Sequence, residues 1–191
     1  MAVFEGVVLE DARTILGRYP EAHQRSAIMP LLYLAQSIEG MVGREALREI
    51  GELLGITTAE VEAVASFYSM YRLLPTGEHL VTVCTNLSCK LRGAEVVYEA
   101  AREAAGILHG EELSPDGLFT VHEEECLGVC DFAPAVQFNV CNHDNVTPGR
   151  MRELIAALRD GEVPTPARGP AFGSFKAASR ALAGLEEVPA S

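Results

Sequence analysis

Apolar residues in the first part of the chain recur every three or four positions, the period of an amphipathic helix. This period runs through residues 27–39 and again through residues 44–54. A third helix is expected to begin at Thr57, which forms the pattern of a capping box with Glu60, and to run to about Tyr71. Four large side chains crowd its end, and they are predicted to lie in the core, with an exposed patch that contacts a partner as the alternative: Phe67, Tyr68, Met70 and Tyr71.

The period changes after Pro75-Thr76-Gly77, where the helical pattern breaks. We therefore predict a helical N-terminal domain over residues 1–78 and a second domain over residues 79–160. The second domain is expected to contain strands at 79–84, 118–122 and 135–140, a turn at Asn142–Asn145, and helices at 89–106 and 149–159. This order predicts an α/β layer, in which helices pack on a sheet.

Residues 161–191 hold four of the ten prolines together with many small residues, and they are predicted to form a C-terminal tail. Four apolar residues in this tail have helical spacing: Phe175, Ala178, Leu182 and Leu185. A loosely ordered terminus is the first expectation. An amphipathic segment that docks on another surface is the alternative.

The charge of the chain restricts its partners. Its 27 acidic and 15 basic residues give a formal net charge of −12, which disfavours binding to nucleic acid or to anionic lipid. No run of 18 apolar residues and no signal peptide is visible, so the sequence predicts a cytoplasmic protein without membrane insertion. Such an acidic surface would suit docking to a basic protein face.

Four of the five cysteines form two closely spaced pairs. Cys84 and Cys89 are the ends of a C-x4-C motif, and Cys126 and Cys130, after 36 intervening residues, are the ends of a C-x3-C motif. Each pair follows a predicted strand, so both loops are expected at the carboxyl edge of the sheet. Two loops with two thiolates each meet the need of a [2Fe-2S] cluster for two sulfurs per iron.

Other uses of these cysteines stay open at this point. Structural zinc sites usually contain C-x2-C, so the spacings disfavour zinc without excluding it. A thioredoxin-type dithiol also requires C-x2-C. Disulfides are disfavoured in a reducing compartment. Cys141 fits neither pair and is predicted to be a core or strand-end residue, and His122 is interpreted as a strand-surface residue rather than as a residue that tunes a cluster.

The surroundings of the pairs predict how a cluster would be tuned. Cys89 is expected at a helix N-terminus, with Lys90 and Arg92 adding positive charge, and Gly128 would let backbone amides approach the sulfurs. These features would raise the reduction potential of a cluster. The acidic run 123–125 would lower it, although a solvated face is the simpler interpretation.

Two stretches of the sequence resemble a known family. "VASFYSMYRLLPTGEHLVTVCTNLSCKLRGAE" and the later "ECLGVCDFAPAVQFN" are similar to the small iron–sulfur subunit of NADH-quinone oxidoreductase, the respiratory complex I. The resemblance covers residues 27–158. It implies an N-terminal helical bundle followed by a thioredoxin-like [2Fe-2S] ferredoxin domain, with Cys84, Cys89, Cys126 and Cys130 as the cluster ligands.

The resemblance also implies a role and partners. The chain would be an electron-transfer subunit whose single cluster accepts or stores one electron close to the FMN of a partner subunit. FMN and NADH would be bound by that partner, within the peripheral arm of a membrane-associated complex. The sequence agrees, because it contains neither a G-x-G-x-x-G motif after a strand nor a P-loop, so we expect no substrate site in the chain itself.

Overall fold

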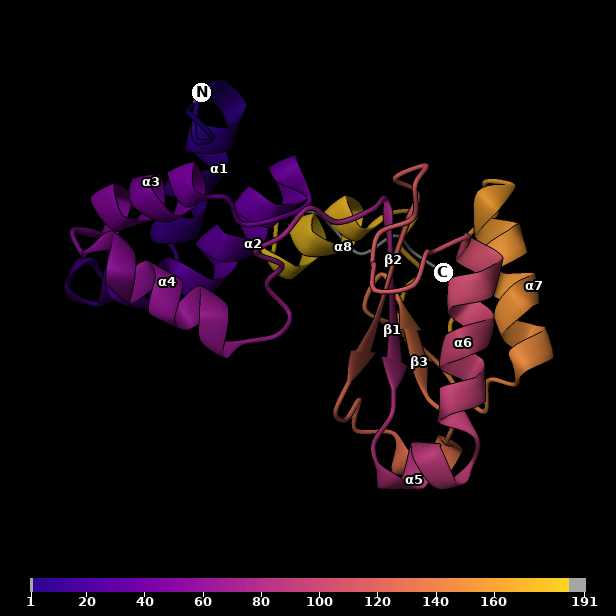
Figure 1. Ribbon diagram of the computed structural model, residues 1–191. Helices are drawn as coiled ribbons and strands as arrows, with labels where there is room; N and C mark the ends of the chain where they lie inside the picture. Colours follow the sequence, from indigo (N-terminus) through magenta and orange to yellow (C-terminus); the bar gives the residue numbers. More distant parts are fainter. Residues whose placement is uncertain (1, 186–191) are drawn as a thin grey trace. The chain divides into compact units, whose positions relative to one another are not determined.

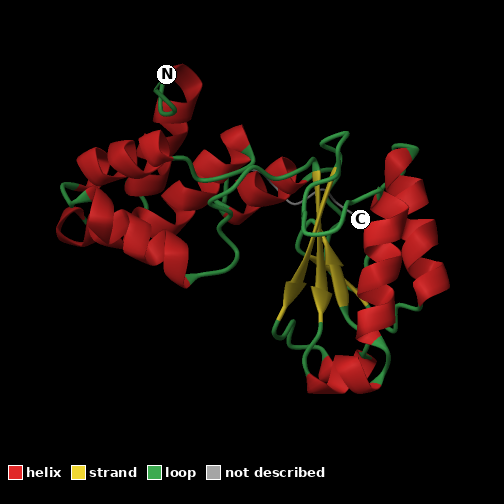
Figure 2. Cartoon of the chain, in the orientation of Figure 1, coloured by secondary structure: helices red, strands yellow, loops and turns green. Residues whose placement is uncertain are grey.

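A computed structural model describes residues 2–185 of the protein, and its chain divides into two compact units. The helical unit comprises residues 2–75 together with 176–185. The sheet unit comprises Thr76–Phe175. Figure 1 labels the elements, and Figure 2 shows that the strands all belong to the sheet unit. No helix within residues 2–185 is long and apolar enough to cross a membrane.

The helical unit is built on amphipathic helices that share one apolar core. Its elements are α1 (Gly6–Leu16), the 3-10 helix η1 (Glu21–Ala27), α2 (Ile28–Glu39), α3 (Arg44–Leu54), α4 (Thr58–Phe67) and α8 (Phe175–Leu182). The periodicity located α2 and α3 to within a residue. The capping box of α4 is also confirmed, since Thr57 accepts from the Glu60 N–H while the Glu60 carboxylate accepts from the Thr57 N–H.

The end of α4 differs from the prediction. The helix stops at Phe67, four residues before Tyr71, and the chain continues without regular structure. Tyr71 is buried as expected, but Phe67, Tyr68 and Met70 are 78%, 37% and 40% exposed. The prediction that they lie in the core was therefore wrong for three of the four side chains, because hydrophobic character alone does not say on which side of a loop a residue will lie.

Helix α8 belongs to the helical unit from Lys176 onward, so this part of the predicted tail follows the amphipathic alternative rather than a loosely ordered terminus. The Gln36 amide donates to the Ser179 hydroxyl at 3.2 Å, and the Lys176 ammonium donates to the carbonyl of Ile38 at 2.8 Å. Arg18 donates to the carbonyl of Ala183 at 2.8 Å. Residues 186–191, at the end of the predicted tail, lie outside the described part of the chain.

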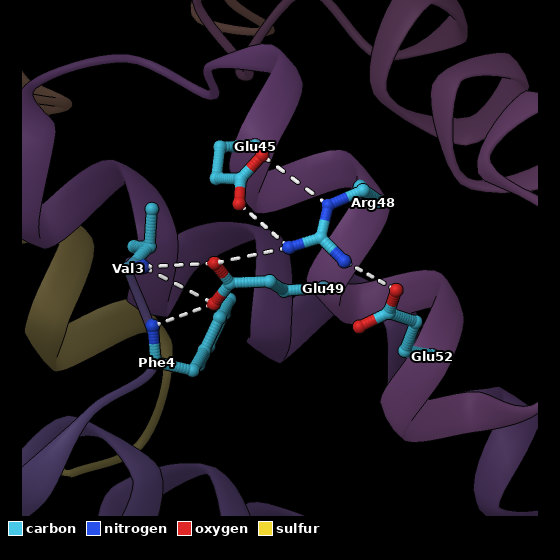
Figure 3. Close-up of polar contacts among 6 residues, drawn as sticks. All are labelled: Val3, Phe4, Glu45, Arg48, Glu49 and Glu52. Atoms are coloured by element: carbon cyan, nitrogen blue, oxygen red, sulfur yellow. Dashed lines mark hydrogen bonds and ion pairs between the residues drawn. The ribbon is translucent and has the colours of Figure 1, made fainter. Parts of the chain in front are cut away.

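The start of the chain is fastened to α3 by a buried carboxylate (Figure 3). Glu49 accepts hydrogen bonds from the backbone N–H groups of Val3, at 3.0 and 3.1 Å, and of Phe4, at 2.8 Å. Arg48 lies 3.8 Å from Glu49 and also pairs with Glu45 and Glu52. The buried charge of Glu49 is thus satisfied by amides and by a neighbouring cation.

The sheet unit contains a four-stranded mixed sheet in the order β2-β1-β3-β4. Its strands are β1 (His79–Cys84), β2 (Phe119–Glu124), β3 (Val136–Phe138) and β4 (Cys141–His143), and its helices are α5 (Leu87–Leu91), α6 (Ala94–Ala105), the short 3-10 helix η2 (Cys130–Phe132) and α7 (Pro148–Arg159). β1 runs parallel to β2 and antiparallel to β3, and β3 pairs antiparallel with β4.

Helices α6 and α7 pack side by side against one face of this sheet (Figure 1). The core between these helices and the sheet contains Val81 and Val83 of β1, Phe119 and Val121 of β2, and Leu154 of α7. Alternate residues of the strands thus point into the core, as expected for a sheet covered on that face. Thr147 caps α7 and Pro148 occupies its first turn, as the sequence predicts.

Two details of this unit correct the sequence prediction. The helix expected over 89–106 is two helices, because Gly93 adopts a left-handed conformation (φ 90°) between α5 and α6. The turn expected at Asn142–Asn145 is replaced by strand β4, and the chain reverses earlier, at Asn139 and Val140, which both have positive φ.

Candidate functional site: the cysteine edge of the sheet

Both cysteine loops lie at one edge of the sheet. β1 ends at Cys84, and its parallel neighbour β2 ends at Glu124, the register partner of Cys84, two residues before Cys126. β3 is antiparallel to β1 and therefore begins at the same edge, shortly after Cys130. Figure 1 shows α5 at the end of β1, at this edge. The topology thus brings together two segments that are far apart in the sequence.

The first cysteine loop, residues 84–89, is enclosed. Cys84 is 2% exposed and Cys89 is 1% exposed. They form a small apolar cluster with Ala94, Ala133 and Ala135. The backbone is fixed as well, because the N–H of Cys84 donates to the carbonyl of Ala135 at 3.1 Å. Small side chains let the loop backbones approach both sulfurs closely.

The second cysteine loop, residues 126–130, is open to solvent, and both its thiols are exposed. Gly128 has a φ of 74°, a left-handed conformation that glycine adopts without steric cost. This conformation directs the Gly128 N–H to the sulfur of Cys126 at a distance of 3.4 Å. The prediction that Gly128 would bring an amide to a cysteine sulfur is confirmed.

The thiols interact within each pair and between the pairs. Burial raises the pKa of the Cys89 thiol, and the neighbouring Cys84 and Cys130 add to the rise. The hydrogen bond with Cys126 is the largest cause of the raised pKa of Cys130, and the nearby Cys84 contributes too. Four sulfurs grouped two by two match the donor set that a [2Fe-2S] cluster requires.

Two residues near the sulfurs were missed in the sequence. The backbone N–H of Ala135 hydrogen-bonds Cys89 and offsets part of the rise in its pKa. The Ser88 hydroxyl does the same for Cys130, and so links the two cysteine loops. No sequence signal marks a backbone amide 46 positions away, although a hydroxyl next to a candidate ligand could have been noted.

The predicted electrostatics hold in part. Cys89 is the third residue of the five-residue helix α5, so it lies in the first turn at a helix N-terminus as predicted, although the helix begins two residues earlier than expected, at Leu87 with Asn86 as its cap. Lys90 forms an ion pair with Glu95 at 2.6 Å, and this pairing raises the pKa of Lys90. The positive charge of Lys90 is therefore partly neutralised by Glu95 of α6, and it stabilises negative charge on the sulfurs less than the sequence suggested.

The remaining candidates lie apart from the pairs. Cys141 is buried in β4, and its thiol donates to the carbonyl of Pro170 at 2.9 Å. His122 is also buried, and its Nε2 lies 2.9 Å from the hydroxyl of Thr82 on the adjacent strand, so the interpretation as a strand-surface residue was wrong. A neighbouring strand satisfies His122, which is consistent with a structural role.

The donor chemistry of the edge fits an iron–sulfur group. Within residues 2–185 no group of three or more His, Cys, Asp or Glu side chains is already arranged to hold a metal ion, although the thiols of the two pairs influence one another. Thiolates are the ligands that iron–sulfur clusters prefer, and amide donors to sulfur are a usual part of such sites. The four cysteines are thus suited to a group that bridges two pairs.

These features define a class of protein, and a family model described as thioredoxin-like [2Fe-2S] ferredoxin matches residues 12–159. The chain belongs to this family, whose cofactor is a [2Fe-2S] cluster. Among curated proteins it is similar to the E subunit of the NADH-quinone oxidoreductase of Mycobacterium bovis, with 45% identity over 177 residues, 93% of this chain and 69% of the relative. It is also similar to subunit 2 of that enzyme from Thermus thermophilus, with 47% identity over 76% of this chain and 80% of the relative.

A solved structure shares the fold. An NAD+-reducing [NiFe]-hydrogenase in its H2-reduced state superimposes with a TM-score of 0.61 and 22% identity over 72% of this chain. The aligned part is only 22% of that longer chain. At this identity the likeness establishes the fold, with its helices and mixed sheet, and no more.

Proposed function

We propose that this chain is the electron-transfer subunit of an NADH-quinone oxidoreductase, and that Cys84, Cys89, Cys126 and Cys130 hold its one [2Fe-2S] cluster. The observation that carries the assignment of ligands is the meeting of two thiol pairs at one sheet edge. The relatives named above support the assignment to this enzyme. The chain acts within an enzyme complex, without a substrate site of its own.

The cluster supplies a site that gains and loses one electron. The residues of the chain set its surroundings: the first cysteine loop excludes water from one pair of sulfurs, and the second leaves the other pair accessible. The N–H groups of Gly128 and Ala135 direct positive dipole ends to sulfurs, which favours the reduced state. The acidic side chains around residue 124 oppose this effect.

The partner in this proposal is the subunit that binds FMN and NADH, within the peripheral arm of the complex. The cluster would accept or store an electron close to the FMN during NADH oxidation. The chain would be cytoplasmic and associated with the membrane only through the complex. The helices of residues 2–75 would form an N-terminal bundle, separate from the ferredoxin domain over 79–160.

Electron transfer from the flavin subunit tests the proposal. The chain with its cluster is mixed with NADH in the presence or absence of the purified FMN-binding subunit, and the electron paramagnetic resonance signal of the reduced cluster is recorded. We expect the signal only when both NADH and the flavin subunit are present. Reduction by NADH without the flavin subunit, or no reduction in a complex that does form, would contradict the proposed role.

A further inference from the structure

The segment that follows α4 presents an unusual group of side chains to solvent. Phe67, Tyr68, Met70, Leu73 and Leu74, which we call the 67–74 patch, are 78%, 37%, 40%, 40% and 69% exposed. They lie within eight consecutive positions of the helical unit, outside both cysteine loops. A group of exposed apolar residues of this kind in a folded protein usually marks an interaction surface.

The segment is held firmly in this conformation although it has no regular structure. The fully buried Gln36 donates to the carbonyl of Met70 at 3.2 Å and accepts from the N–H of Arg72 at 2.7 Å. The carbonyl of Arg72 also accepts from the N–H of Val42 at 2.7 Å. The backbone that carries the patch is therefore fixed to α2 and to the turn before α3.

One inward-pointing side chain, that of Tyr71, also fixes the segment that carries the patch. Tyr71 is 4% exposed, its ring lies 4.9 Å from that of Tyr33, and its hydroxyl donates to the carbonyl of Met29 at 3.1 Å. Because Tyr71 points inward from a fixed backbone, its neighbours are held outward. The rings of Phe67 and Tyr68 also support each other edge to face, with centroids 4.9 Å apart. A surface fixed in advance loses little conformational entropy on binding.

The charge distribution indicates what covers the patch. Between Glu62 and Glu78 the only charged residue is Arg72, whereas the whole chain has 27 acidic residues and a net charge of −12. Association of two copies would bring two strongly acidic chains together, which disfavours a homodimer. A different protein with a neutral or basic surface avoids this repulsion. Its contact surface must be apolar to match exposed aromatic rings.

We propose that the 67–74 patch is a docking surface, through which the helical unit binds an apolar face of the flavin-bearing subunit. This inference rests on the proposed function for the identity of the partner, but not on the cluster. Phe67 and Leu74, the two most exposed members, are expected to contribute most to the affinity.

The test measures the affinity of the full-length, cluster-containing chain for the purified FMN-binding subunit by calorimetry. In the test variant Phe67→Ser is combined with Leu74→Ser. The matched control combines Val7→Ser with Val96→Ser, which removes two apolar side chains that are 70% and 60% exposed elsewhere. We expect the dissociation constant to rise more than tenfold in the test variant and less than twofold in the control. Equal affinities of the two variants would overturn the proposal.

Hydroxyl-radical footprinting of the unmodified chain keeps the proposal testable if the variant does not fold. Oxidation of residues 67–74 should fall at least fivefold when the flavin subunit binds. Unchanged oxidation in the complex would overturn the proposal, and so would full protection in the free monomer, which would mean that the chain covers its own patch. A dimer in sedimentation equilibrium that the test variant abolishes would assign the patch to a second copy instead.

The same preparations separate this inference from the proposed function. If the flavin subunit binds and reduces the cluster of the test variant with unchanged affinity, the electron-transfer role stands and the docking surface is wrong. If the unmodified chain binds through the patch but its cluster is not reduced, the docking surface stands and the electron-transfer role is wrong.

Discussion

The two cysteine loops place the same chemical group in opposite surroundings. The first loop encloses Cys84 and Cys89 among alanines, whereas the second leaves Cys126 and Cys130 exposed. The first ends a central strand and continues into α5, while the second connects an edge strand to a short 3-10 helix. The comparison suggests a division of roles: the first loop provides a rigid, water-excluding half of the site, and the second provides an accessible half.

Removal of single cysteines should give the largest effect and could break the comparison. We expect Cys84→Ala and Cys126→Ala each to abolish cluster binding, because one iron would lose one of its two cysteine ligands. Cys141→Ala is the matched control, since this buried thiol lies in β4 outside both loops. Iron and sulfide analysis should show near-complete loss in the first two variants and full content in the control. Full iron content in Cys126→Ala would exclude that residue as a ligand.

The reactivity of the thiols should sharpen the comparison. In the chain freed of its cluster, Cys126 and Cys130 should react with iodoacetamide at least about tenfold faster than Cys84 and Cys89, because reactivity follows access and thiolate character. Access decides the difference, because Cys84 and Cys89 are buried whereas Cys126 and Cys130 are exposed, and the pKa is raised for Cys130 as well as for Cys89. Peptide mass spectrometry over a time course measures the four rates. Equal rates would mean that the first loop opens readily without the cluster.

Two glycines allow the loops to be compared by the same substitution. Gly93, which follows the first loop, and Gly128, within the second, both have positive φ and free space where a Cβ would lie. Alanine at either site should lower the free energy of unfolding by about 1 kcal/mol through backbone strain. Only Gly128→Ala should also shift the reduction potential, because backbone strain at this site would displace the N–H that contacts the sulfur of Cys126. Urea unfolding and a redox titration measure both effects, and equal shifts in potential would contradict the account.

The smallest effect concerns two buried histidines of the sheet unit that lie outside both cysteine loops. Burial lowers the pKa of His79, at the start of β1, and burial with the nearby Arg150 lowers the pKa of His143, at the end of β4. Both histidines therefore bind protons less readily in the folded state than in the unfolded chain, and their contribution to stability is complete above the unfolded pKa of about 6.5. It is lost as the pH falls below that value, because the unfolded chain then binds more protons.

Urea unfolding at pH 7.5 and 5.5 checks this sign. The free energy of unfolding should be lower at pH 5.5, and the difference should shrink in His143→Gln but not in His109→Gln, which changes an exposed histidine. A chain that is equally stable at both pH values would contradict the lowered pKa of the two buried histidines.

The sequence predicted those features that local pattern determines. The bounds of α3 follow from a helical apolar period that ends at Gly55, and those of β1 follow from an apolar run that ends at Cys84. The break at Gly93 was missed because the residues on both sides of it fit one helical pattern. The ion pair of Lys90 with Glu95 depends on that break, so the charge near Cys89 was misjudged too.

Other features required the tertiary structure. The strand order β2-β1-β3-β4, which brings the two cysteine loops to one edge, depends on pairings of β1 with segments 40 residues (His79 with Phe119) and 57 residues (Val81 with Phe138) further along the chain. The exposure of Phe67 and Leu74 depends on how Gln36 fixes a loop more than 30 residues away. The candidate ligands themselves were visible at once, because cysteine spacing is a local signal.

The central claim is that the four paired cysteines hold a [2Fe-2S] cluster, and the most direct test of it is to measure which metal the chain binds. The chain is purified without oxygen and analysed for iron, sulfide and zinc, and its electron paramagnetic resonance spectrum is recorded before and after dithionite. The account predicts about two irons and two sulfides per chain, with a signal only after reduction. A colourless protein with stoichiometric zinc, still colourless after iron–sulfur reconstitution, would contradict it.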